Sequence, residues 1–351
     1  MLITWLTYFS TYFGRLNFSA SLSEMSSGGG FPKAELGAVA ASFFLSYGFS
    51  QIFSGILGDR FSPRLLVLAG MACSAIANGV FPFCINTGSM TVVWFLNGLA
   101  QAFIWAPMSR YIADRTSGAQ YIRIVLLLST TGPAGMFCAY GVCAILLRSY
   151  GWQSCFWMAF IVLLAAALIW LCGTMAIDRY AARNGIIEKE TDGEKVQDKK
   201  RKGSFWGLTK ASGFLWIAVS VCLHGLLKDG LNTWIPTYLA EVFAITPSFS
   251  LTLTMILPIS NLSGVYLANR LNLRFRNEVK TAAIFFLCAF IAIIGMMFVG
   301  SSTLAGVVLL FAVVTSAMTA VNTIFISVLP VHFRQFGVIS TVSGMLNATT
   351  Y

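Results

Sequence analysis

Two basic residues stand inside long apolar stretches of this sequence, where a charged side chain is least expected. Arg15 lies in the run Tyr8–Phe18, and Lys228 lies in the run Leu226–Gly230. A basic residue at the middle of a bilayer costs at least about 2.5–3.5 kcal/mol, so it normally faces the interior of a helix bundle and has a partner. Two fixed cations without a matching pair of buried acids predict a binding site for an anion.

Polar and aromatic side chains accompany both cations at helical spacing. Residues three and four apart share a helix face, and a polar stripe on an apolar helix usually lines water or another helix. Aromatic residues are also common packing groups, and a lone histidine more often bonds a neighbouring helix. We nevertheless expect these residues to line the cavity around each cation. The first stripe is Tyr8, Tyr12 and Arg15, and the second is His224, Lys228 and Asn232.

Asp229 is the acid that follows Lys228, and two roles are open for it. Adjacent residues on a helix diverge by about 100°, so we expect Lys228 and Asp229 to lie on different faces. The preferred role for Asp229 is structural or gating, and proton coupling is the alternative. The null hypothesis for either cation is that it only neutralises a neighbouring acid or bonds to carbonyls.

The composition places the elements that carry these residues in a lipid bilayer. Of 351 residues, 57% are hydrophobic and 10% are charged, with a mean hydropathy of +0.77. Soluble domains carry about 25% charged residues. The net charge of +10 lies mostly in short loops between apolar runs, which argues against a nucleic-acid partner. The eight cysteines lie in or beside apolar runs and show no metal-ligand spacing, so we expect no metal and no cofactor.

The apolar segments predict an all-α integral membrane protein, since a spanning helix needs about 20 mostly apolar residues. An eleventh span begins near residue 336, and we expect the C-terminal end to be truncated, with a twelfth span missing. The domains we predict are an N-terminal bundle over 1–178, a linker over 179–211 and an incomplete C-terminal bundle over 212–351. Ten spans precede the eleventh, at 1–24, 36–58, 64–86, 90–112, 121–147, 152–178, 212–240, 247–270, 278–300 and 304–328.

The basic residues also predict an orientation. Cytoplasmic loops are enriched in Lys and Arg. With the mixed-charge 179–211 linker in the cytoplasm, only Lys33 and Arg148 of the 23 Lys and Arg residues fall on the other side, and Arg15 and Lys228 remain inside spans. We therefore predict a multi-pass protein of the plasma (inner) membrane with a cytoplasmic linker.

The run from Gly55 to Arg64 follows the second predicted span. It resembles the signature loop of the major facilitator superfamily, a G-x-x-x-D-R-x-G-R pattern, although Ser62 and Pro63 stand where Gly and Arg are usual. The resemblance implies two six-helix bundles and a gating role for the loop, here carried by Gly55, Asp59 and Arg60.

Within that superfamily, the chain looks most like the organophosphate:phosphate antiporters, the group of the glycerol-3-phosphate and hexose-phosphate transporters. In that family a basic residue from each half binds the substrate phosphate, which implies this role for Arg15 and Lys228. The resemblance also implies that Tyr8, Tyr12, Tyr47 and Trp105 line the cavity. It rests on Tyr8–Phe18, on Tyr47–Gln51 with the signature loop, on Trp105–Arg110, and on Leu226–Gly230 with Trp234–Leu239.

Four positions depart from the glycerol-3-phosphate transporters. Leu16 and Gln51 stand where those proteins have lysines, Gly132 stands near their histidine of the fifth span, and Lys228 stands where they have Arg. Lysine is a point charge without the bidentate fork of arginine. These departures leave the substrate open and weaken phosphate against carboxylate.

We expect a monomeric secondary transporter that moves an anionic metabolite, in first place a phosphate ester in exchange for inorganic phosphate, by alternating access. One alternative is a proton- or sodium-coupled symporter for organic anions such as sugar acids, which would need a carboxylate in the membrane for coupling. A second alternative is a sensor built on a transporter scaffold. An enzyme is not expected, since the sequence has only two histidines, His224 and His332, and no catalytic constellation is present.

Overall fold

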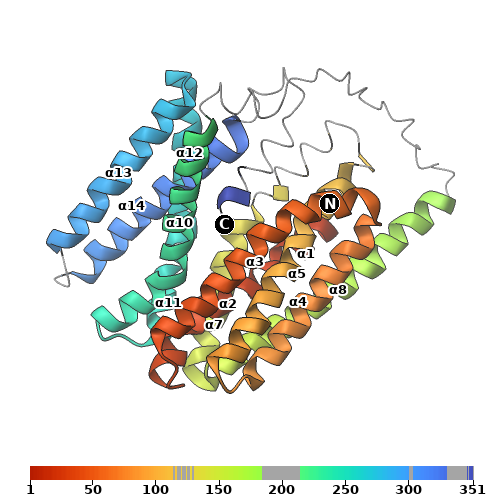
Figure 1. The fold of residues 1–351 in the computed structure, drawn as a ribbon, viewed down its shortest axis with the longest axis horizontal. Helices are drawn as coiled ribbons and strands as arrows, with labels where there is room; N and C mark the ends of the chain where they lie inside the picture. Colours follow the sequence, from red (N-terminus) through yellow and green to blue (C-terminus); the bar gives the residue numbers. More distant parts are fainter. Residues whose placement is uncertain are drawn as a thin grey trace. The chain divides into compact units, whose positions relative to one another are not determined.

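The protein is all-helical over the residues that its computed structural model describes (Figure 1). These are residues 1–113, 115–116, 120, 124, 127–128, 130–183, 214–299, 303–329, 346 and 348–350. The chain divides into two compact units, Met1–Lys199 and Lys200–Tyr351. The boundary falls within the predicted 179–211 linker, of which residues 184–211 lie outside the described part.

The first unit consists of long helices joined by short turns. Its elements are α1 (Leu2–Thr11), α2 (Phe13–Ser27), α3 (Lys33–Arg60), α4 (Pro63–Val80), the 3-10 turn η1 (Phe81–Phe83), α5 (Thr87–Ala113), α7 (Thr131–Tyr150) and α8 (Trp152–Arg183). Proline and glycine set several of their ends. Pro63 occupies the first position of α4, where its missing N–H costs nothing. Gly151 has a φ of 75° between α7 and α8, a conformation that glycine adopts readily.

The second unit is also built of helices joined by short turns. Its elements are α10 (Phe214–Val242), α11 (Pro247–Thr254), α12 (Ile256–Phe275), α13 (Glu278–Val299), α14 (Leu304–Asn322) and the π-helical turn η2 (Thr323–Val328). The Thr246 side chain caps α11 by accepting a hydrogen bond from the Phe249 N–H. Arg276, in the left-handed conformation, ends α12.

The helices match the predicted spans closely, but two spans are each divided into two helices. The predicted 247–270 span is α11 and α12, which meet at Met255. The first predicted span, 1–24, is two helices that meet at Tyr12. There the Tyr12 N–H bonds to the Phe9 carbonyl and the Arg15 N–H to the Tyr12 carbonyl, both three residues back. This tightened turn lies beside Arg15. Part of the predicted 121–147 span and most of the eleventh span lie outside the described residues.

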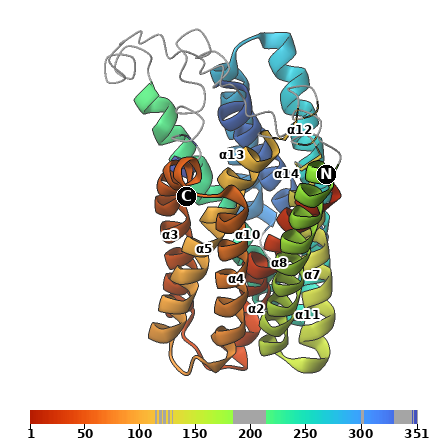
Figure 2. The same ribbon diagram turned by 90° about the vertical axis from the view of Figure 1, so that its right-hand side faces the viewer.

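In the first unit, α3, α4 and α5 lie side by side, and α8 packs on α4 (Figure 1, Figure 2). Small residues allow the close approach. A Cβ at Gly98 of α5 would collide with the Phe43 carbonyl oxygen of α3, and a Cβ at Gly70 of α4 would lie 2.7 Å from the Ala100 carbonyl oxygen of α5. Glycine at helix contacts is typical of packing inside membranes.

In the second unit, α14 is the central helix and contacts α10, α12 and α13. Its buried side chains, among them Val314, Met318 and Val321, form one cluster with residues of the other three helices. This arrangement makes α14 the element on which α10, the helix of Lys228, is supported.

Seven helical segments in the described part of the chain are long and apolar enough to cross a membrane. Large apolar side chains also point outward. Met297 and Phe298 of α13 are 80% and 85% exposed. Contiguous exposed apolar surface of this kind is unfavourable in water and marks contact with lipid or a partner. The segments are Pro63–Phe83, Thr87–Ile112, Thr131–Tyr150, Trp152–Tyr180, Pro247–Phe275, Glu278–Val299 and Leu304–Ile326.

Candidate anion-binding residues

Arg15 lies in the first turn of α2, directly after the tightened turn at Tyr12. Three aromatic rings surround its guanidinium. The Cζ atom is 4.7 Å from the ring centroid of Tyr47, 5.6 Å from that of Tyr12 and 5.9 Å from that of Phe43. An aromatic face attracts a cation within about 6 Å, and arginine is the cation most often found there. The rings therefore stabilise a positive charge that is partly removed from water.

Gln101 of α5 holds the same guanidinium from another side. The Arg15 Nε–H donates to Oε1 of Gln101 at 3.1 Å. The Gln101 side chain is itself fixed, because its Nε2 donates to Oγ of Ser74 at 3.2 Å and to the Thr11 carbonyl oxygen at 3.4 Å. Gln101 is 1% exposed. The hydrogen bond through Nε orients the guanidinium, a planar group that can bind an anion in a bidentate manner.

A buried network of amide and hydroxyl groups extends from Gln101 to the turn in the first span. The Gly14 carbonyl accepts from the Asn97 amide at 2.8 Å and from the Asn78 amide at 3.4 Å. Ser74 donates to Asn97 at 2.6 Å, and Asn17 donates to Asn78 at 2.8 Å. Side chains of α4 and α5 thus satisfy backbone carbonyls next to the break, which fixes the segment that carries Arg15.

The predicted aromatic wall is assembled beside this network. The ring centroids of Tyr8 and Trp105 are 4.8 Å apart, and those of Tyr8 and Tyr12 are 5.9 Å apart. Tyr12 lies against α7, where a Cβ at Gly135 would come within 2.7 Å of its ring and a Cβ at Gly132 within 3.1 Å of its hydroxyl. The structure therefore places Tyr12 and Tyr47 against Arg15, and it places Tyr8 and Trp105 next to Tyr12 within the same unit.

Lys228 is the central residue of α10, and it pairs with the acid that follows it although the two residues lie on different faces of the helix. Its Nζ lies 3.4 Å from Oδ1 of Asp229, with side-chain exposures of 17% and 16%. The two Cβ atoms do diverge around the helix, but the flexible four-carbon stem of lysine reaches across the gap. The ion pair that we had set aside as a null hypothesis is thus present.

The other two predicted residues of α10 flank this pair by one turn on each side. His224 is 1% exposed, and within the described part of the chain its Nε2 has no hydrogen-bond partner. Asn232 is half-buried, and the neighbouring Thr233 hydroxyl donates to the Asp229 carbonyl oxygen at 2.7 Å. His224, Lys228 and Asn232 therefore follow one stripe of α10, as the spacing predicted.

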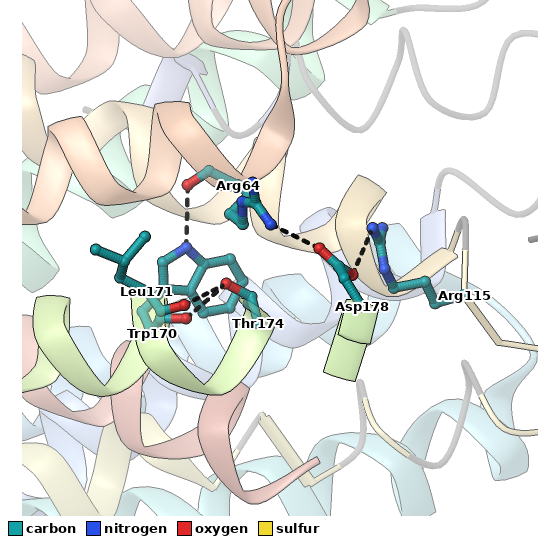
Figure 3. Close-up of polar contacts among 6 residues, drawn as sticks. All are labelled: Arg64, Arg115, Trp170, Leu171, Thr174 and Asp178. Carbon is teal, nitrogen blue, oxygen red and sulfur yellow. Dashed lines mark hydrogen bonds and ion pairs between the residues drawn. The ribbon is translucent and has the colours of Figure 1, made fainter. Parts of the chain in front are cut away.

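The predicted gating residues Gly55, Asp59 and Arg60 lie in the last turns of α3, and their side chains are outside the described part. A charged cluster nearby is described (Figure 3). Asp178 of α8 pairs with Arg64 at 2.6 Å and with Arg115 at 3.3 Å.

The Trp170 indole in turn donates to the Arg64 carbonyl oxygen at 3.0 Å (Figure 3). These contacts join the start of α4, and a residue shortly after the end of α5, to α8. The sequence had suggested only a topological role for Arg64 and Arg115.

Comparison with known proteins decides the family. A model described as Major Facilitator Superfamily matches residues 4–351. The chain belongs to the major facilitator superfamily. Solved structures agree on this fold: a nucleoside transporter NupG mutant has a TM-score of 0.74 at 15% identity, with 99% of this chain and 86% of that chain covered. A D-xylose-proton symporter has a TM-score of 0.69 at 13% identity, covering 99% and 87%.

Curated relatives within this superfamily include the glycerol-3-phosphate transporter of Bacillus subtilis (strain 168), 27% identical over 306 residues, 82% of this chain and 68% of the relative. The membrane sensor protein UhpC of Escherichia coli (strain K12) is 24% identical over 257 residues, covering 70% and 57%. A probable hexose phosphate transport protein of Chlamydia trachomatis is 22% identical over 262 residues, covering 67% and 55%. The chain thus spans 55% to 68% of the length of these three relatives.

These relatives agree with the predicted resemblance to the organophosphate:phosphate antiporters. With its candidate spans, the protein is a multi-pass plasma-membrane protein of the transporter class and not an enzyme. In the described part of the chain, no group of three His, Cys, Asp or Glu residues could hold a metal ion.

Sequence reasoning missed the residues that position Arg15. The signal for them was available, because Ser74 and Asn78 in α4, and Asn97 and Gln101 in α5, are polar pairs four residues apart in apolar segments. Such pairs indicate a polar helix face. The sequence did not show that both faces meet the same turn of the first span.

Proposed function

We propose that the protein is a secondary transporter for an anionic organic metabolite, in first place a phosphate ester, exchanged for inorganic phosphate by alternating access. The observation that carries the proposal is the environment of Arg15. A partly buried guanidinium that lies among the rings of Tyr12 and Tyr47 and is oriented through Nε by the uncharged Gln101 is suited to bind an anion.

In transporters built from two related halves, the substrate binds near the midplane, where the halves meet. We propose Lys228 as the second anion ligand, because it is the central residue of α10 and is partly buried. Tyr8, Tyr12, Tyr47 and Trp105 would line the path beside Arg15, and His224 and Asn232 the path beside Lys228. The names of the curated relatives, glycerol-3-phosphate transporter and hexose phosphate transport protein, support a phosphate ester as the substrate.

We also propose a gating role for the residues at the C-terminal end of α3. Gly55, Asp59 and Arg60 would work together with the Arg64–Asp178–Arg115 cluster. Arg64 follows them closely in the sequence, and the cluster links the start of α4 and the segment just after α5 to α8. The 179–211 linker would lie in the cytoplasm, because the basic residues concentrate on its side of the membrane.

The structure and the comparisons bear on the two alternative functions, a proton-coupled symporter and a sensor. A proton-coupled symporter for sugar acids needs a titrating carboxylate in the membrane, and the candidate, Asp229, is paired with Lys228. A sensor role is favoured by one observation, the similarity to the membrane sensor protein UhpC.

Reconstitution of the full-length protein in phosphate-loaded liposomes separates these functions. Exchange of labelled internal phosphate for external glycerol 3-phosphate or glucose 6-phosphate, independent of pH and sodium gradients, is the expected result. Arg15→Lys should raise the substrate concentration at half-saturation about ten-fold or more, because lysine lacks the bidentate guanidinium of arginine. The control Arg148→Lys, outside the predicted cavity, should not change it. Saturable binding without flux would instead assign the protein to the sensors.

A further inference from the structure

The Lys228–Asp229 ion pair gives Lys228 a counter-anion at the middle of α10, a helix that the sequence predicts to cross the membrane. Lys228 is the middle residue of the 29-residue helix α10 (Phe214–Val242). At a rise of 1.5 Å per residue, it lies about 21 Å from either end of the helix. The hydrocarbon core of a bilayer is about 30 Å thick, so this position falls near its middle. The 3.4 Å separation and the low exposure of both side chains show a pair largely removed from water.

Lys228 and Arg15 are stabilised by different means. Arg15 has its charge spread over a planar group against three aromatic rings and an amide oxygen. Lysine carries a compact, strongly hydrated charge that loses more on leaving water. An anion at Lys228 is therefore needed whenever water is excluded from it, and in the described structure Asp229 supplies that anion.

We propose that Asp229 is the resident counter-anion of Lys228, that substrate replaces it there, and that the protein can therefore return empty and carry out net transport as well as exchange. This inference rests on the proposed function. When an anionic group binds, the lysine ammonium, which has three donors, turns toward the substrate. When substrate leaves, the ammonium returns to Asp229.

The consequence concerns the empty transporter. A carrier whose cations have only the substrate as their anion must leave a charge uncompensated when it closes empty, and burying an unpaired charge is strongly unfavourable. Such a carrier is held to obligatory exchange. With Asp229 in place, the Lys228–Asp229 pair has no net charge in the empty state, so closure without substrate avoids this penalty at Lys228.

The test compares net efflux with exchange in the same liposomes. The full-length protein is reconstituted with labelled phosphate inside, and valinomycin with equal potassium on both sides removes any membrane potential. Efflux is measured into medium without a transported anion and into medium with unlabelled phosphate. For the unchanged protein we expect net efflux within about ten-fold of exchange. Exchange without measurable net efflux would overturn the inference and leave the proposed function standing, whereas no flux of either kind would contradict the proposed function itself.

Two variants assign the effect to the ion pair. Asp229→Asn leaves Lys228 without its acid, and the ratio of net efflux to exchange should fall about ten-fold or more. The double variant Lys228→Gln/Asp229→Asn removes both charges and should restore the ratio, even where its total flux is lower. Glu241→Gln, which removes another acid of α10, should keep the ratio of the unchanged protein.

An equal ratio in Asp229→Asn, in the double variant and in the unchanged protein would overturn the role of Asp229. So would net efflux that requires a pH gradient and loses this requirement in Asp229→Asn, since that result identifies a proton-coupling carboxylate. If Asp229→Asn does not reach the membrane, the double variant and the unchanged protein still decide, because a low ratio in the unchanged protein contradicts the inference by itself.

Discussion

Arg15 donates from Nε to Oε1 of Gln101 at 3.1 Å, and this bond joins the first span to α5 at the level of the tightened turn. Gln101 is an amide, so it orients the guanidinium without neutralising it. An acid at the same place would pair with Arg15 and compete with a substrate anion. The same side chain reaches the Thr11 carbonyl, so Gln101 contributes both to the position of the cation and to the shape of the broken span.

Gln101→Leu should therefore reduce substrate affinity more than it reduces stability of the fold. A hydrogen bond to a charged group contributes about 1.5–3 kcal/mol, so half-saturation should rise about ten-fold or more. The measurement is concentration dependence of exchange in liposomes. Gln153→Leu, at an exposed position of α8, is the matched control. An unchanged half-saturation in Gln101→Leu would show that Arg15 is held without it.

The ring of Tyr47 should matter more than its hydroxyl. The ring centroid lies 4.7 Å from Cζ of Arg15, and a cation–π contact contributes about 0.5–2 kcal/mol. Tyr47→Phe keeps the ring and should change half-saturation less than about two-fold, whereas Tyr47→Leu should raise it about two- to thirty-fold. Melting temperatures of both variants in detergent control for packing, since Tyr47 is buried. Equal kinetics of the two variants would argue against a role for the aromatic face.

The sequence predicted the helices well because lipid imposes a simple rule. A span must be long and apolar, so the 278–300 prediction and the observed α13 (Glu278–Val299) nearly coincide. The break at Tyr12 was not predictable in this way. It lies next to the Gly14 carbonyl, which accepts hydrogen bonds from Asn78 and Asn97, residues more than 60 positions away.

For the site residues too, the sequence predicted what depends on local spacing and missed what depends on side-chain contacts. Spacing alone predicted the stripe with Tyr8, Tyr12 and Arg15, and the structure places the three together. The Lys228–Asp229 pair contradicted a rule based on Cβ directions, because side-chain length was not considered. Length and flexibility decide whether a lysine meets its neighbour.

Asp178 should stabilise the end of the first unit at which it binds two arginines, but only modestly. The three side chains are 27% to 33% exposed, so solvent screens the pairs with Arg64 and Arg115 (Figure 3). We expect Asp178→Asn to lower the free energy of unfolding by about 1 kcal/mol or less. Thermal melts at low and high salt measure this, and the difference from the unchanged protein should shrink at high salt. Arg179→Gln, on an exposed side chain of α8, is the control. A large, salt-independent loss would contradict surface ion pairing.

Gly264 should be a point at which the second unit accepts no larger residue. A Cβ there would collide with the Ser316 carbonyl oxygen and lie 2.7 Å from its Oγ, where α12 packs on α14. The Ser316 hydroxyl also donates to the Ser260 carbonyl oxygen at 3.0 Å, so it cannot turn away without losing that bond. Gly264→Ala should therefore separate the helices and destabilise the unit by about 1–3 kcal/mol.

Gly230 provides the matched comparison, because a Cβ at this position of α10 meets nothing within 4 Å. Gly230→Ala should leave the melting temperature unchanged or raise it, since alanine favours a helix over glycine by about 1 kcal/mol. Both variants are measured in the same detergent by thermal melting of the full-length protein. Similar melting temperatures for Gly264→Ala and Gly230→Ala would mean that α12 and α14 are not in tight contact. A selective loss in Gly264→Ala would show that the support of α14, and through it of the helix carrying Lys228, depends on this close approach.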